Sequence, residues 1–537
     1  MIRLFQNPLF AGLILLILSA TPALAIDNNT GISDDLIANL ITGSDDQAVS
    51  AVAQLAVCEY TTLVQALQDF RDYPQSKQLG GFVHYLYSAN DSAEAPWFVF
   101  VPEGYNPTTP TPMVIWLHGG VGRREFITQD TAYASTADDF LDLDAITMCR
   151  ENNWLCVVPM ARFDCLWWNN TGMNYLTDII RQIKRGYNID DSRVILSGFS
   201  DGGSGSYHFA FLAPTDFSLI FPYSGHIGVG SRIGGMQVYP HNLAVRPIYA
   251  VNGGADGLYP AAAFVDPLRQ IILATDARLS YTVYDTAHHD HGYLRLEMPK
   301  MADRIRKYAR DPFASKLYWE CNDLSYGRAD WIEITGIDTT LERAEWQTEV
   351  NYQLEDSRIT VGFMANREFA DTKVLVESLS DDEDAPARTA GLLAGDHILE
   401  FDGIPLASLA DLGRAKDTKQ RGDSFTMKVS RDGKEIMLSG KFPPIGHYDQ
   451  FVYEKPSAAV RAVNSGNSFF VETSRVASLS IYIHPRMVQL DQPVKIIVNG
   501  KELFNGILQP DAEFMLDEFR HDHDRQLLWA GKIDVTL

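Results

Sequence analysis

The stretch that most constrains this chain is VILSGFSDGG, at residues 194–203. Its first half is apolar, as in a buried strand, and its second half is a G-x-S-x-G turn centred on Ser200. A helical apolar pattern resumes at residues 207–212. Glycines on both sides of a serine let a strand and a helix approach each other closely at a strained turn. The sequence therefore predicts a serine hydroxyl exposed on a tight strand–turn–helix junction, the geometry of a nucleophile elbow.

Two strand-like runs later in the chain lead into candidate partners for this serine. Residues 246–251, RPIYAV, precede a glycine-rich loop that contains Asp256. Residues 279–284, LSYTVY, precede a polar run with three histidines, His288, His289 and His291. The carboxyl ends of parallel strands share one edge of a sheet, and a serine, an acid and a histidine in this chain order suit that edge. We therefore expect an acid and a base to meet Ser200 there.

A fourth element lies upstream of the serine. Residues 112–117, PMVIWL, have the composition of another buried strand, and His118, Gly119 and Gly120 follow it. Backbone N–H groups of such a loop, together with that of the residue after the serine, stabilise the oxyanion that develops during acyl transfer. We therefore predict an oxyanion and substrate-binding site at His118, Gly119, Gly120 and Asp201.

Residues 80–312 resemble the α/β-hydrolase superfamily, in particular the secreted esterases grouped with polyhydroxyalkanoate depolymerases, feruloyl esterases and predicted peptidases. The likeness is carried by the motifs above and by YNIDDSRV, which leads into the serine turn. It implies that Ser200 is the nucleophile, Asp256 the acid and His289 the base, since His289 takes the second place of what is usually a Gly-His pair. His288, which stands where glycine is commoner, and His291 remain alternative bases.

The chemistry that this resemblance implies is acyl transfer from a carboxylic ester through an acyl-enzyme intermediate, without a cofactor. A serine peptidase is one alternative, because the pocket alone distinguishes the two substrates. A non-catalytic binding or scaffold protein is another. Imidazoles and a carboxylate at residues 288–291 also suit zinc, but adjacent residues rarely converge on one ion, so we expect no metal.

A second module follows the hydrolase-like region. Residues 385–399, APARTAGLLAGDHIL, and 401–406, FDGIPL, resemble a bacterial-type PDZ domain, and Asp432-Gly433 predicts its closing hairpin turn. The family's carboxylate-binding loop lies where this chain has Val361, Gly362 and Phe363. The resemblance implies that a peptide or a protein C-terminus adds a strand to the sheet there. Such a domain also serves elsewhere as a structural spacer.

The N-terminus predicts where the protein works. It contains Arg3 without an acidic residue, an apolar run at residues 9–18, and Ala23-Leu24-Ala25. This pattern predicts a signal peptide cleaved after Ala25, and export to a periplasm or the outside. No later segment has the length and hydropathy of a membrane span. The 69 acidic and 45 basic residues give a formal net charge of −24, which argues against nucleic acid and anionic membranes as partners.

The expected fold class is multidomain: an α/β-hydrolase with a mostly parallel sheet flanked by helices, then a PDZ domain within or beside a β-rich C-terminal region. The two β-rich flanks are expected to form one β-sandwich that the PDZ domain interrupts. The expected segments are a signal peptide at 1–25, a helical segment packed on the hydrolase at 26–79, the hydrolase at 80–312, a β-rich segment at 313–355, the PDZ domain at 356–442 and a C-terminal β-rich domain at 443–537.

Some local expectations complete the picture. Residues 344–352 are expected to form a strand, and residues 299–310 a helix with Pro299 in its first turn. The run HDHD at 521–524 is expected to be a solvated loop. Trp167 and Trp168 are expected in the core rather than in a substrate pocket, whereas Arg123 and Arg124 suit an acidic substrate or the bare surface equally. Cys149, Cys156 and Cys165 flank one strand and have room for one disulfide among them, but a fold of this size does not need it, and the sequence leaves the pairing open.

Overall fold

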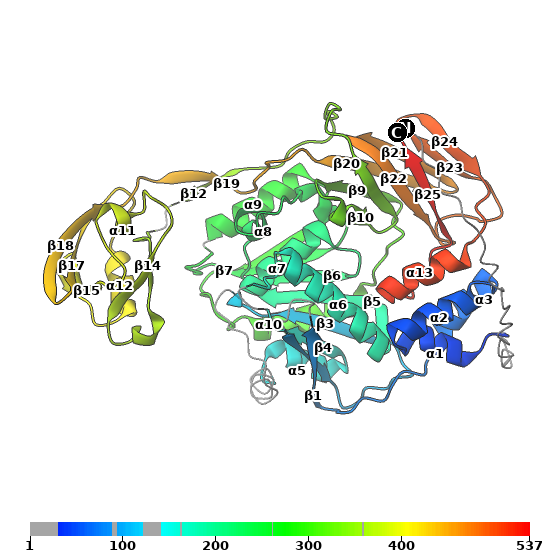
Figure 1. The fold of residues 1–537 in the computed structure, drawn as a ribbon, viewed down its shortest axis with the longest axis horizontal. Coiled ribbons are helices and arrows are strands. Elements are labelled where there is room, and N and C mark those ends of the chain that lie inside the picture. The colour runs from blue at the N-terminus through cyan, green and yellow to red at the C-terminus, as the bar shows by residue number, and fades with distance from the viewer. Residues whose placement is uncertain (1–30, 89–93, 122–140, 162–163, 260, 357–358) are drawn as a thin grey trace, which may run out of the picture.

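The computed structural model describes residues 31–88, 94–121, 141–161, 164–259, 261–356 and 359–537 (Figure 1). The expected signal peptide, Arg123 and Arg124 lie outside the described residues. Within the described part of the chain, no helix combines the length and the apolar character that crossing a bilayer requires.

An eight-stranded sheet forms the centre of the molecule, in the order β1-β2-β4-β3-β5-β6-β7-β8. Strands β3 to β8 are parallel to one another, whereas β2 is antiparallel to both of its neighbours, β1 and β4. This confirms the mostly parallel sheet of the α/β-hydrolase class. Its strands are β1 (Gly81–Ser88), β2 (Glu94–Val101), β3 (Thr111–Leu117), β4 (Leu155–Pro159), β5 (Ile189–Phe199), β6 (Leu219–Tyr223), β7 (Ile248–Gly253) and β8 (Leu279–Tyr284).

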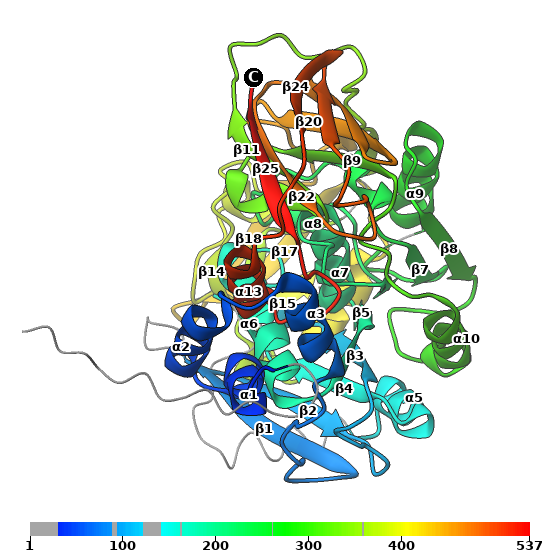
Figure 2. The same cartoon turned by 90° about the vertical axis from the view of Figure 1, so that its right-hand side faces the viewer.

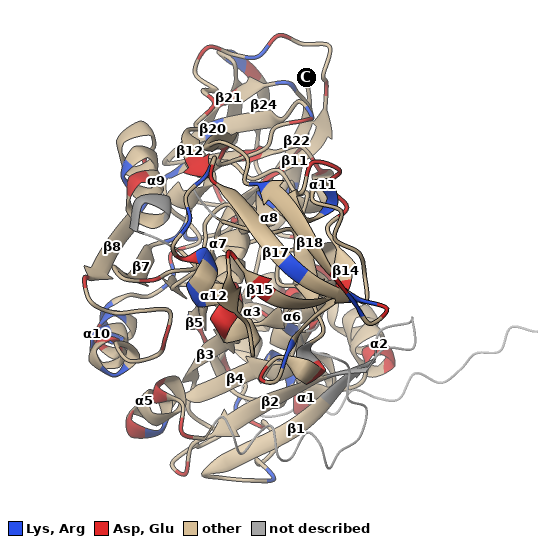
Figure 3. Ribbon diagram, turned by 90° about the vertical axis from the view of Figure 1, so that its left-hand side faces the viewer, with Lys and Arg blue, Asp and Glu red and all other residues tan. Residues whose placement is uncertain are grey.

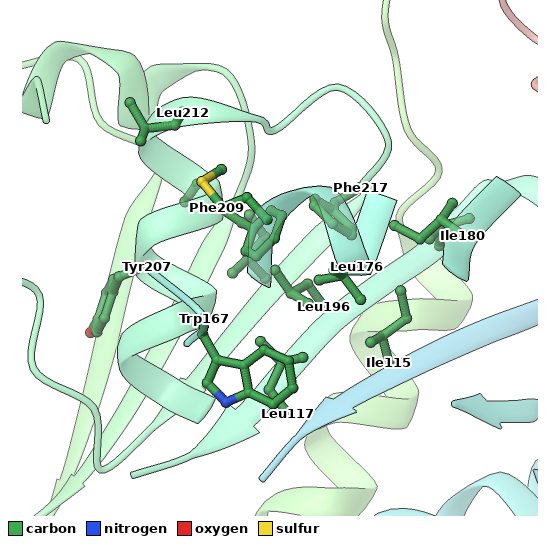
Figure 4. Packing of buried hydrophobic residues seen from close by; sticks show 14 of the residues in the cluster. Ile115, Leu117, Trp167, Leu176, Ile180, Leu196, Tyr207, Phe209, Leu212 and Phe217 are labelled. Carbon is green, nitrogen blue, oxygen red and sulfur yellow. The ribbon is translucent and has the colours of Figure 1, made fainter. Parts of the chain in front are cut away.

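Helices bury both faces of this sheet. The apolar side chains of β3 alternate between two cores, because successive residues of a strand point to opposite faces. Ile115 and Leu117 join the core that includes side chains of α6, α7 and α9 (Figure 4), and Trp116 joins the core that includes side chains of α5 and α10. The helices of this region are α5 (Asp144–Asn152), α6 (Asn170–Gly186), α7 (Asp201–Leu212), α8 (Val229–Arg232), the 3-10 helix η2 (Pro240–Ala244), α9 (Ala261–Ala274) and α10 (Leu294–Lys307).

Helix α10 differs from the expectation for residues 299–310. It begins at Leu294, so Pro299 lies inside the helix and not in its first turn. A proline there removes one backbone hydrogen bond and crowds the preceding turn. Burial of Leu294, Met298 and Met301 against the sheet outweighs that cost, and the helix continues through the proline.

The β-rich region is built from chain on both sides of the PDZ domain. Its two sheets have the strand orders β10-β11-β22-β25 and β24-β23-β21-β20-β9, and they enclose one apolar core. Asn499-Gly500 forms the hairpin turn between β23 and β24, with φ of 51° and 80° at the two turn residues. The strands are β9 (Lys316–Cys321), β10 (Arg328–Ala329), β11 (Ile332–Ile337), β20 (Ala458–Ser465), β21 (Ser468–Ser474), β22 (Val476–Ile483), β23 (Val494–Val498), β24 (Lys501–Gly506) and β25 (Gly531–Thr536), with the 3-10 helix η3 (Leu324–Tyr326) between β9 and β10.

The PDZ domain stands away from the rest of the molecule on a two-stranded arm, β12 (Gln353–Asp356) paired with β19 (Gly446–Asp449) (Figure 1). Seen from the left-hand side of Figure 1, the PDZ domain lies in front of the hydrolase region (Figure 3). Acidic and basic residues are mixed along the elements that are visible in this view. Asp432-Gly433 forms the expected turn between β17 and β18, with φ of 51° and 76°. Its elements are β13 (Phe363–Ala365), η4 (Arg367–Phe369), β14 (Val374–Leu379), α11 (Pro386–Thr389), β15 (His397–Phe401), β16 (Ile404–Pro405), α12 (Leu409–Lys416), β17 (Ser424–Arg431) and β18 (Lys434–Lys441).

The expected strand at residues 344–352 does not form. Gln347, 2% exposed, donates from Nε2 to Glu320 (2.7 Å) and Ser457 (3.0 Å) and accepts from Ser474 (2.5 Å). The side chain of a single glutamine thus replaces a β-ladder as the hydrogen-bonding partner of this segment. The alternation of apolar and polar residues at 344–352 could not distinguish a β-strand from a segment that is held by one buried glutamine side chain.

Three helices, α1 (Asp34–Thr42), α2 (Asp45–Leu55) and α3 (Tyr60–Asp69), form the N-terminal segment. A capping box of Ser44 and Gln47 starts α2. Their apolar faces share a core with α13 (Ala512–Asp522), which the sequence pattern did not predict (Figure 2). The Tyr60 hydroxyl also donates to the Leu528 carbonyl at 2.7 Å. The segment therefore packs largely on the C-terminal region.

Residues 521–524 are not the solvated loop that we expected. The carboxylate of Asp524 is fully buried and accepts hydrogen bonds from Lys184 on α6 (2.8 Å) and from Arg310 (2.7 Å). His523 is buried as well. A second buried ion pair, Arg246 with Asp330, joins the start of β7 to the β-rich region. Partners far away in the sequence supply the opposite charges that compensate for the lost hydration of these buried groups. The local sequence pattern therefore wrongly predicted that they are exposed.

Cys149, Cys156 and Cys165 form no disulfide with one another, and the fold does not require one. All five cysteines, including Cys149, Cys156 and Cys165, are free. Trp167 and Trp168 are buried, 0% and 5% exposed, as expected of core residues.

Candidate active site

Ser200 occupies the turn between β5 and α7 in a strained backbone conformation, with φ 58° and ψ −119°. The turn is possible because its glycines carry no Cβ atom: a Cβ on Gly198 would lie 2.6 Å, and one on Gly202 1.8 Å, from the carbonyl oxygen of Leu117. The N–H of Ser200 donates to the carbonyl of Tyr223 at 2.9 Å. The sheet thus holds the serine in a position that strain alone would disfavour.

One hydrogen-bonded chain connects the three candidate residues. His289 Nε2 lies 2.9 Å from Ser200 Oγ, and His289 Nδ1 lies 2.7 Å from Asp256 Oδ2. The other oxygen of Asp256 accepts the backbone N–H groups of Leu258 and Tyr259, both at 2.9 Å. Loops after β5, β7 and β8 therefore bring an alcohol, an imidazole and a carboxylate together at one edge of the sheet.

The alternative histidines are oriented elsewhere. His288 Nδ1 lies 3.1 Å from the carbonyl oxygen of Ala255, on the surface. The ring of His291 packs edge-on against Phe199, with centroids 4.3 Å apart. Among the described residues, no group of three or more His, Cys, Asp and Glu side chains is arranged to hold a metal ion. His289 is thus the histidine of this run that contacts the serine.

The electrostatics of Asp256 fix the proton positions along this chain. Burial raises the pKa of its carboxyl, but hydrogen bonds from His289, Tyr259 and Leu258 outweigh burial and lower the pKa below its usual value. The carboxylate is therefore ionised and accepts a hydrogen bond from the N–H at His289 Nδ1. In the neutral imidazole this leaves Nε2 with a lone pair directed at the serine hydroxyl.

The predicted oxyanion loop lies against the serine. A Cβ on Gly119 would come within 2.9 Å of Ser200 Cβ, so this loop lies directly against the Ser200 turn. His118 is 4% exposed; its Nε2 accepts the N–H of Ala161 (3.0 Å), which leaves the proton on Nδ1 to donate to the Gly119 carbonyl (2.8 Å). Because the peptide is planar and trans, the N–H of Gly120 points away from His118. His118 therefore orients the loop through its side chain.

Two further contacts position this loop. The carboxylate of Asp201 accepts the N–H of Val121 at 2.9 Å, which ties the loop to the first turn of α7. Trp167 Nε1 donates to the carbonyl of His118 at 3.0 Å. The N–H of Asp201 itself lies at the start of a helix, where backbone donors have no partner within the helix. Trp167 was expected only as a core residue, and the hydrogen bond gives it a second role.

Tyr259 is a residue at this site that sequence reasoning missed. Its ring contacts the ring of His289 edge-on, with centroids 5.5 Å apart, and that of His226 at 5.6 Å. Its position three residues after Asp256, in a loop that follows a strand, was the only available signal.

The candidate peptide-binding loop of the PDZ domain depends on one glycine. Gly362 has φ 87°, and a Cβ there would lie 2.8 Å from that of Ala385. The carbonyls of Val361 and Gly362 accept the N–H groups of Ala387 (2.7 Å) and Ser380 (3.0 Å). Phe363 begins β13, the outermost strand of its sheet. The loop therefore leads directly into a sheet edge.

Comparisons with known proteins agree with this architecture. Residues 92–231 match the family model described as putative esterase, and residues 353–441 match that of the PDZ domain. A bifunctional acetylxylan esterase/xylanase of Neocallimastix patriciarum is 28% identical over 175 residues, 32% of this chain and 22% of that protein. The chain thus spans about a fifth of the length of this curated relative.

Solved structures also resemble the hydrolase region. An S-formylglutathione hydrolase from Agrobacterium tumefaciens superposes with a TM-score of 0.34 at 15% identity, over 44% of this chain and 98% of that one. A ferulic acid esterase superposes with a TM-score of 0.31 at 13% identity, over 42% of this chain and 97% of that one.

Proposed function

We propose that this chain, which carries an esterase-family domain and a PDZ domain, is an exported serine hydrolase that cleaves carboxylic esters. The observation that carries the proposal is the continuous chain of two hydrogen bonds, 2.9 Å from Ser200 to His289 and 2.7 Å from His289 to Asp256. The signal-peptide pattern that ends at Ala25 supports export.

In the proposed reaction, His289 Nε2 removes the hydroxyl proton as Ser200 Oγ attacks the ester carbonyl carbon. The C–O bond to the alcohol then breaks, His289 returns the proton to the leaving oxygen, and an acyl-enzyme forms. A water molecule, deprotonated by the same imidazole, then attacks the acyl carbon. The bond from that carbon to Ser200 Oγ breaks, His289 returns the proton to Oγ, and the carboxylic acid leaves. The ionised Asp256 stabilises the imidazolium that appears in both halves of the cycle.

The proposed oxyanion hole consists of backbone N–H groups from two elements. Asp201 offers the unpartnered N–H at the start of α7, and Gly120 offers an N–H that faces away from His118. The contact of Gly119 with Ser200 supports this assignment, because it brings the loop to the carbon that the serine attacks.

Acetyl esters of a polysaccharide are the first substrate class to test, because the curated relative is an acetylxylan esterase. The mature protein and its Ser200→Ala variant would be compared on p-nitrophenyl acetate, a feruloyl ester and acetylated xylan. We expect serine-dependent release of at least one acid, and labelling of Ser200 by a fluorophosphonate. Equal turnover by the two proteins would refute the assignment, and turnover of peptides alone would favour a peptidase.

We also propose that the PDZ domain binds a peptide with a free carboxyl end at Val361, Gly362 and Phe363. The outer position of β13 supports this, because an added strand needs an unpaired edge. Fluorescence anisotropy of the full chain with carboxylate and amidated forms of the same peptides tests the proposal. We expect Gly362→Val to abolish binding, because valine does not tolerate φ 87°. Equal affinity for the amidated peptides would contradict a carboxylate site.

A further inference from the structure

A cavity of about 230 Å³ lies where the hydrolase region, the β-rich region and the two linkers of the PDZ arm meet. Its lining comes from η2 of the hydrolase region, from β9, and from the segments 343–350 and 453–457, which precede and follow the arm. Pockets for drug-sized ligands measure roughly 300–1,000 Å³, so this one has room for a single small molecule. None of its lining residues belongs to the Ser200 site.

The inner end of the cavity holds a carboxylate that has no positively charged partner. Glu320 lines the cavity and is 4% exposed. Its oxygens accept hydrogen bonds from Gln347 Nε2 (2.7 Å), Ser457 Oγ (2.6 Å) and the Tyr318 hydroxyl (2.7 Å). Among the described residues, no lysine, arginine or histidine forms an ion pair with it. A buried charge is costly unless an opposite charge compensates for its lost hydration, so a cation is what this end of the cavity lacks.

The neighbouring side chains leave room for that cation without supplying it. Burial lowers the pKa of His241, which also lines the cavity, and the Glu320 carboxylate opposes this only in part, so the imidazole is uncharged at neutral pH. Tyr239 and Tyr453 line the cavity with nearly parallel rings, 20° apart in plane and 5.9 Å apart between centroids. Three of the roughly four acceptor positions of a carboxylate are occupied at Glu320, which leaves one for a ligand N–H. Tyrosine rings beside it favour an ammonium group, because the face of such a ring attracts cations.

The mouth of the cavity has the opposite sign of charge. It carries three bases, Arg343, Lys455 and Arg475, and two acids, Glu349 and Glu454, so it is positive overall. Arg343 approaches Glu349 at 3.4 Å, whereas among the described residues neither Lys455 nor Arg475 has an ion-pair partner. Arg475 Nε donates to a backbone carbonyl of the linker before the arm (3.1 Å), which holds its guanidinium group in place. A carboxylate at the mouth would therefore meet two cations that no acid neutralises.

We propose that this cavity binds one free α-amino acid with an apolar side chain. The ammonium group of the ligand donates to Glu320, and its carboxylate meets Lys455 and Arg475. Its side chain packs on the apolar part of the lining, which consists of Pro240, Val350 and Pro456. Such a ligand joins the hydrolase region to the β-rich region at the root of the PDZ arm. The proposal does not depend on ester hydrolysis, because the cavity shares no residue with the Ser200 site.

Isothermal titration calorimetry of the mature protein tests this with L-leucine and two analogues that each lack one charged group. The α-hydroxy acid analogue of leucine has a hydroxyl in place of the ammonium group, and isoamylamine lacks the carboxylate. We expect leucine to bind once per chain, and each analogue to bind at least roughly tenfold more weakly, because each loses a charge-assisted hydrogen bond. Leucine should also raise Tm, since it binds the folded state alone.

Variants then assign the binding to this cavity. Lys455→Gln removes one cation from the mouth, and should weaken leucine binding roughly two- to fivefold while leaving isoamylamine binding unchanged. Lys501→Gln, on the exposed surface of β24, is the matched control and should change neither affinity. Glu320→Gln should abolish the binding of both ligands. If that variant does not fold, Lys455→Gln and the analogues still decide the proposal.

Three results would overturn the proposal. The first is the absence of leucine binding at up to roughly 10 mM. The second is equal affinity for leucine and its hydroxy analogue, which would mean that Glu320 receives no ammonium group. The third is tighter binding of glucuronate than of leucine, which would assign the cavity to a sugar acid. The Ser200→Ala variant keeps the cavity intact and should bind leucine like the wild type, so failure of the proposed ester hydrolysis would leave this test unaffected.

Discussion

Replacing Asp524 with asparagine should separate the C-terminal region from the hydrolase region more effectively than any surface change. The carboxylate accepts Lys184 Nζ at 2.8 Å and Arg310 Nη2 at 2.7 Å, and the side chains of all three are at most 1% exposed. Asparagine has the same shape, but it removes the negative charge and turns an N–H₂ group toward at least one of the two cations. The variant therefore leaves a buried positive charge without full compensation.

The size of the stability loss in Asp524→Asn depends on which ion pairs the two cations keep. Breaking a buried ion pair costs about 3–5 kcal/mol when one partner is removed. Lys184 keeps Asp191 at 3.3 Å and Asp216 at 3.6 Å, so its loss is partly compensated. We expect the lower end of that range, about 3 kcal/mol, and a fall in Tm of roughly 6–12 °C for a unit of this size.

Differential scanning calorimetry and urea denaturation of the mature protein would measure this effect. Asp178→Asn is the matched control, because it breaks the exposed pair with Arg181 at 3.1 Å and should cost less than about 0.5 kcal/mol. If Asp524→Asn lowered the stability no more than Asp178→Asn, the buried ions would not be what joins the two regions.

The pH dependence of this effect has a definite sign. Burial raises the pKa of Asp524, but Arg310 and Lys184 outweigh it and lower the pKa below its usual value. A carboxyl with a lowered folded-state pKa stabilises the protein above its unfolded pKa, near 4, and stops doing so as the pH falls through the folded value. The difference between wild type and Asp524→Asn should therefore be constant above about pH 5 and shrink in more acidic solution.

Three further changes test the geometry of the site. Gly202→Ala should lower both turnover and Tm, because the added methyl group would lie 1.8 Å from the Leu117 carbonyl oxygen. We expect the free energy of unfolding to fall by at least about 2 kcal/mol. Wild-type activity and Tm would contradict the close approach of Gly202 to Leu117. Asp256→Asn should lower kcat by roughly 10⁴ with little change in Tm, because the amide favours the wrong tautomer of His289; a loss below tenfold, measured with p-nitrophenyl acetate, would remove Asp256 from the mechanism. Trp167→Phe keeps one aromatic ring in the core, leaves a small void and removes the donor to the His118 carbonyl. We expect kcat to fall a few-fold at constant KM, which corresponds to roughly 1 kcal/mol. Unchanged kcat would mean that the loop at Gly119 does not need this hydrogen bond.

The juxtaposition of Ser200, His289 and Asp256 could be predicted because each side chain follows a buried apolar run, and the ends of parallel strands meet at one edge. The hairpin turn at Asp432-Gly433 was also predictable, because the two turn residues carry the signal by themselves. Features that depend on distant partners were not. Asp524 contacts Lys184 across 340 positions of the chain, and no local pattern distinguishes a carboxylate with such a partner from a solvated one.

Tyr259 belongs to the same class of unpredictable features. Its ring contacts His226 in the loop after β6 and His289 in the loop after β8, and a tyrosine in a loop carries no pattern of its own. Helix α13 escaped prediction because its apolar face is completed by the N-terminal helices, at the other end of the sequence.

The insertion of the PDZ domain also has a consequence for how the chain is made. Strand β11 pairs with β22, and Thr335 waits for its partner Ser478, 143 positions further on. At about 5–20 residues per second, a ribosome needs roughly 7–30 seconds to supply that partner. During this interval the PDZ domain emerges complete, while β9 and β11 have no sheet to join. The nascent chain therefore finishes the hydrolase sheet and the PDZ domain first, and the sandwich closes last, when β20, β22 and the C-terminal residues leave the exit tunnel.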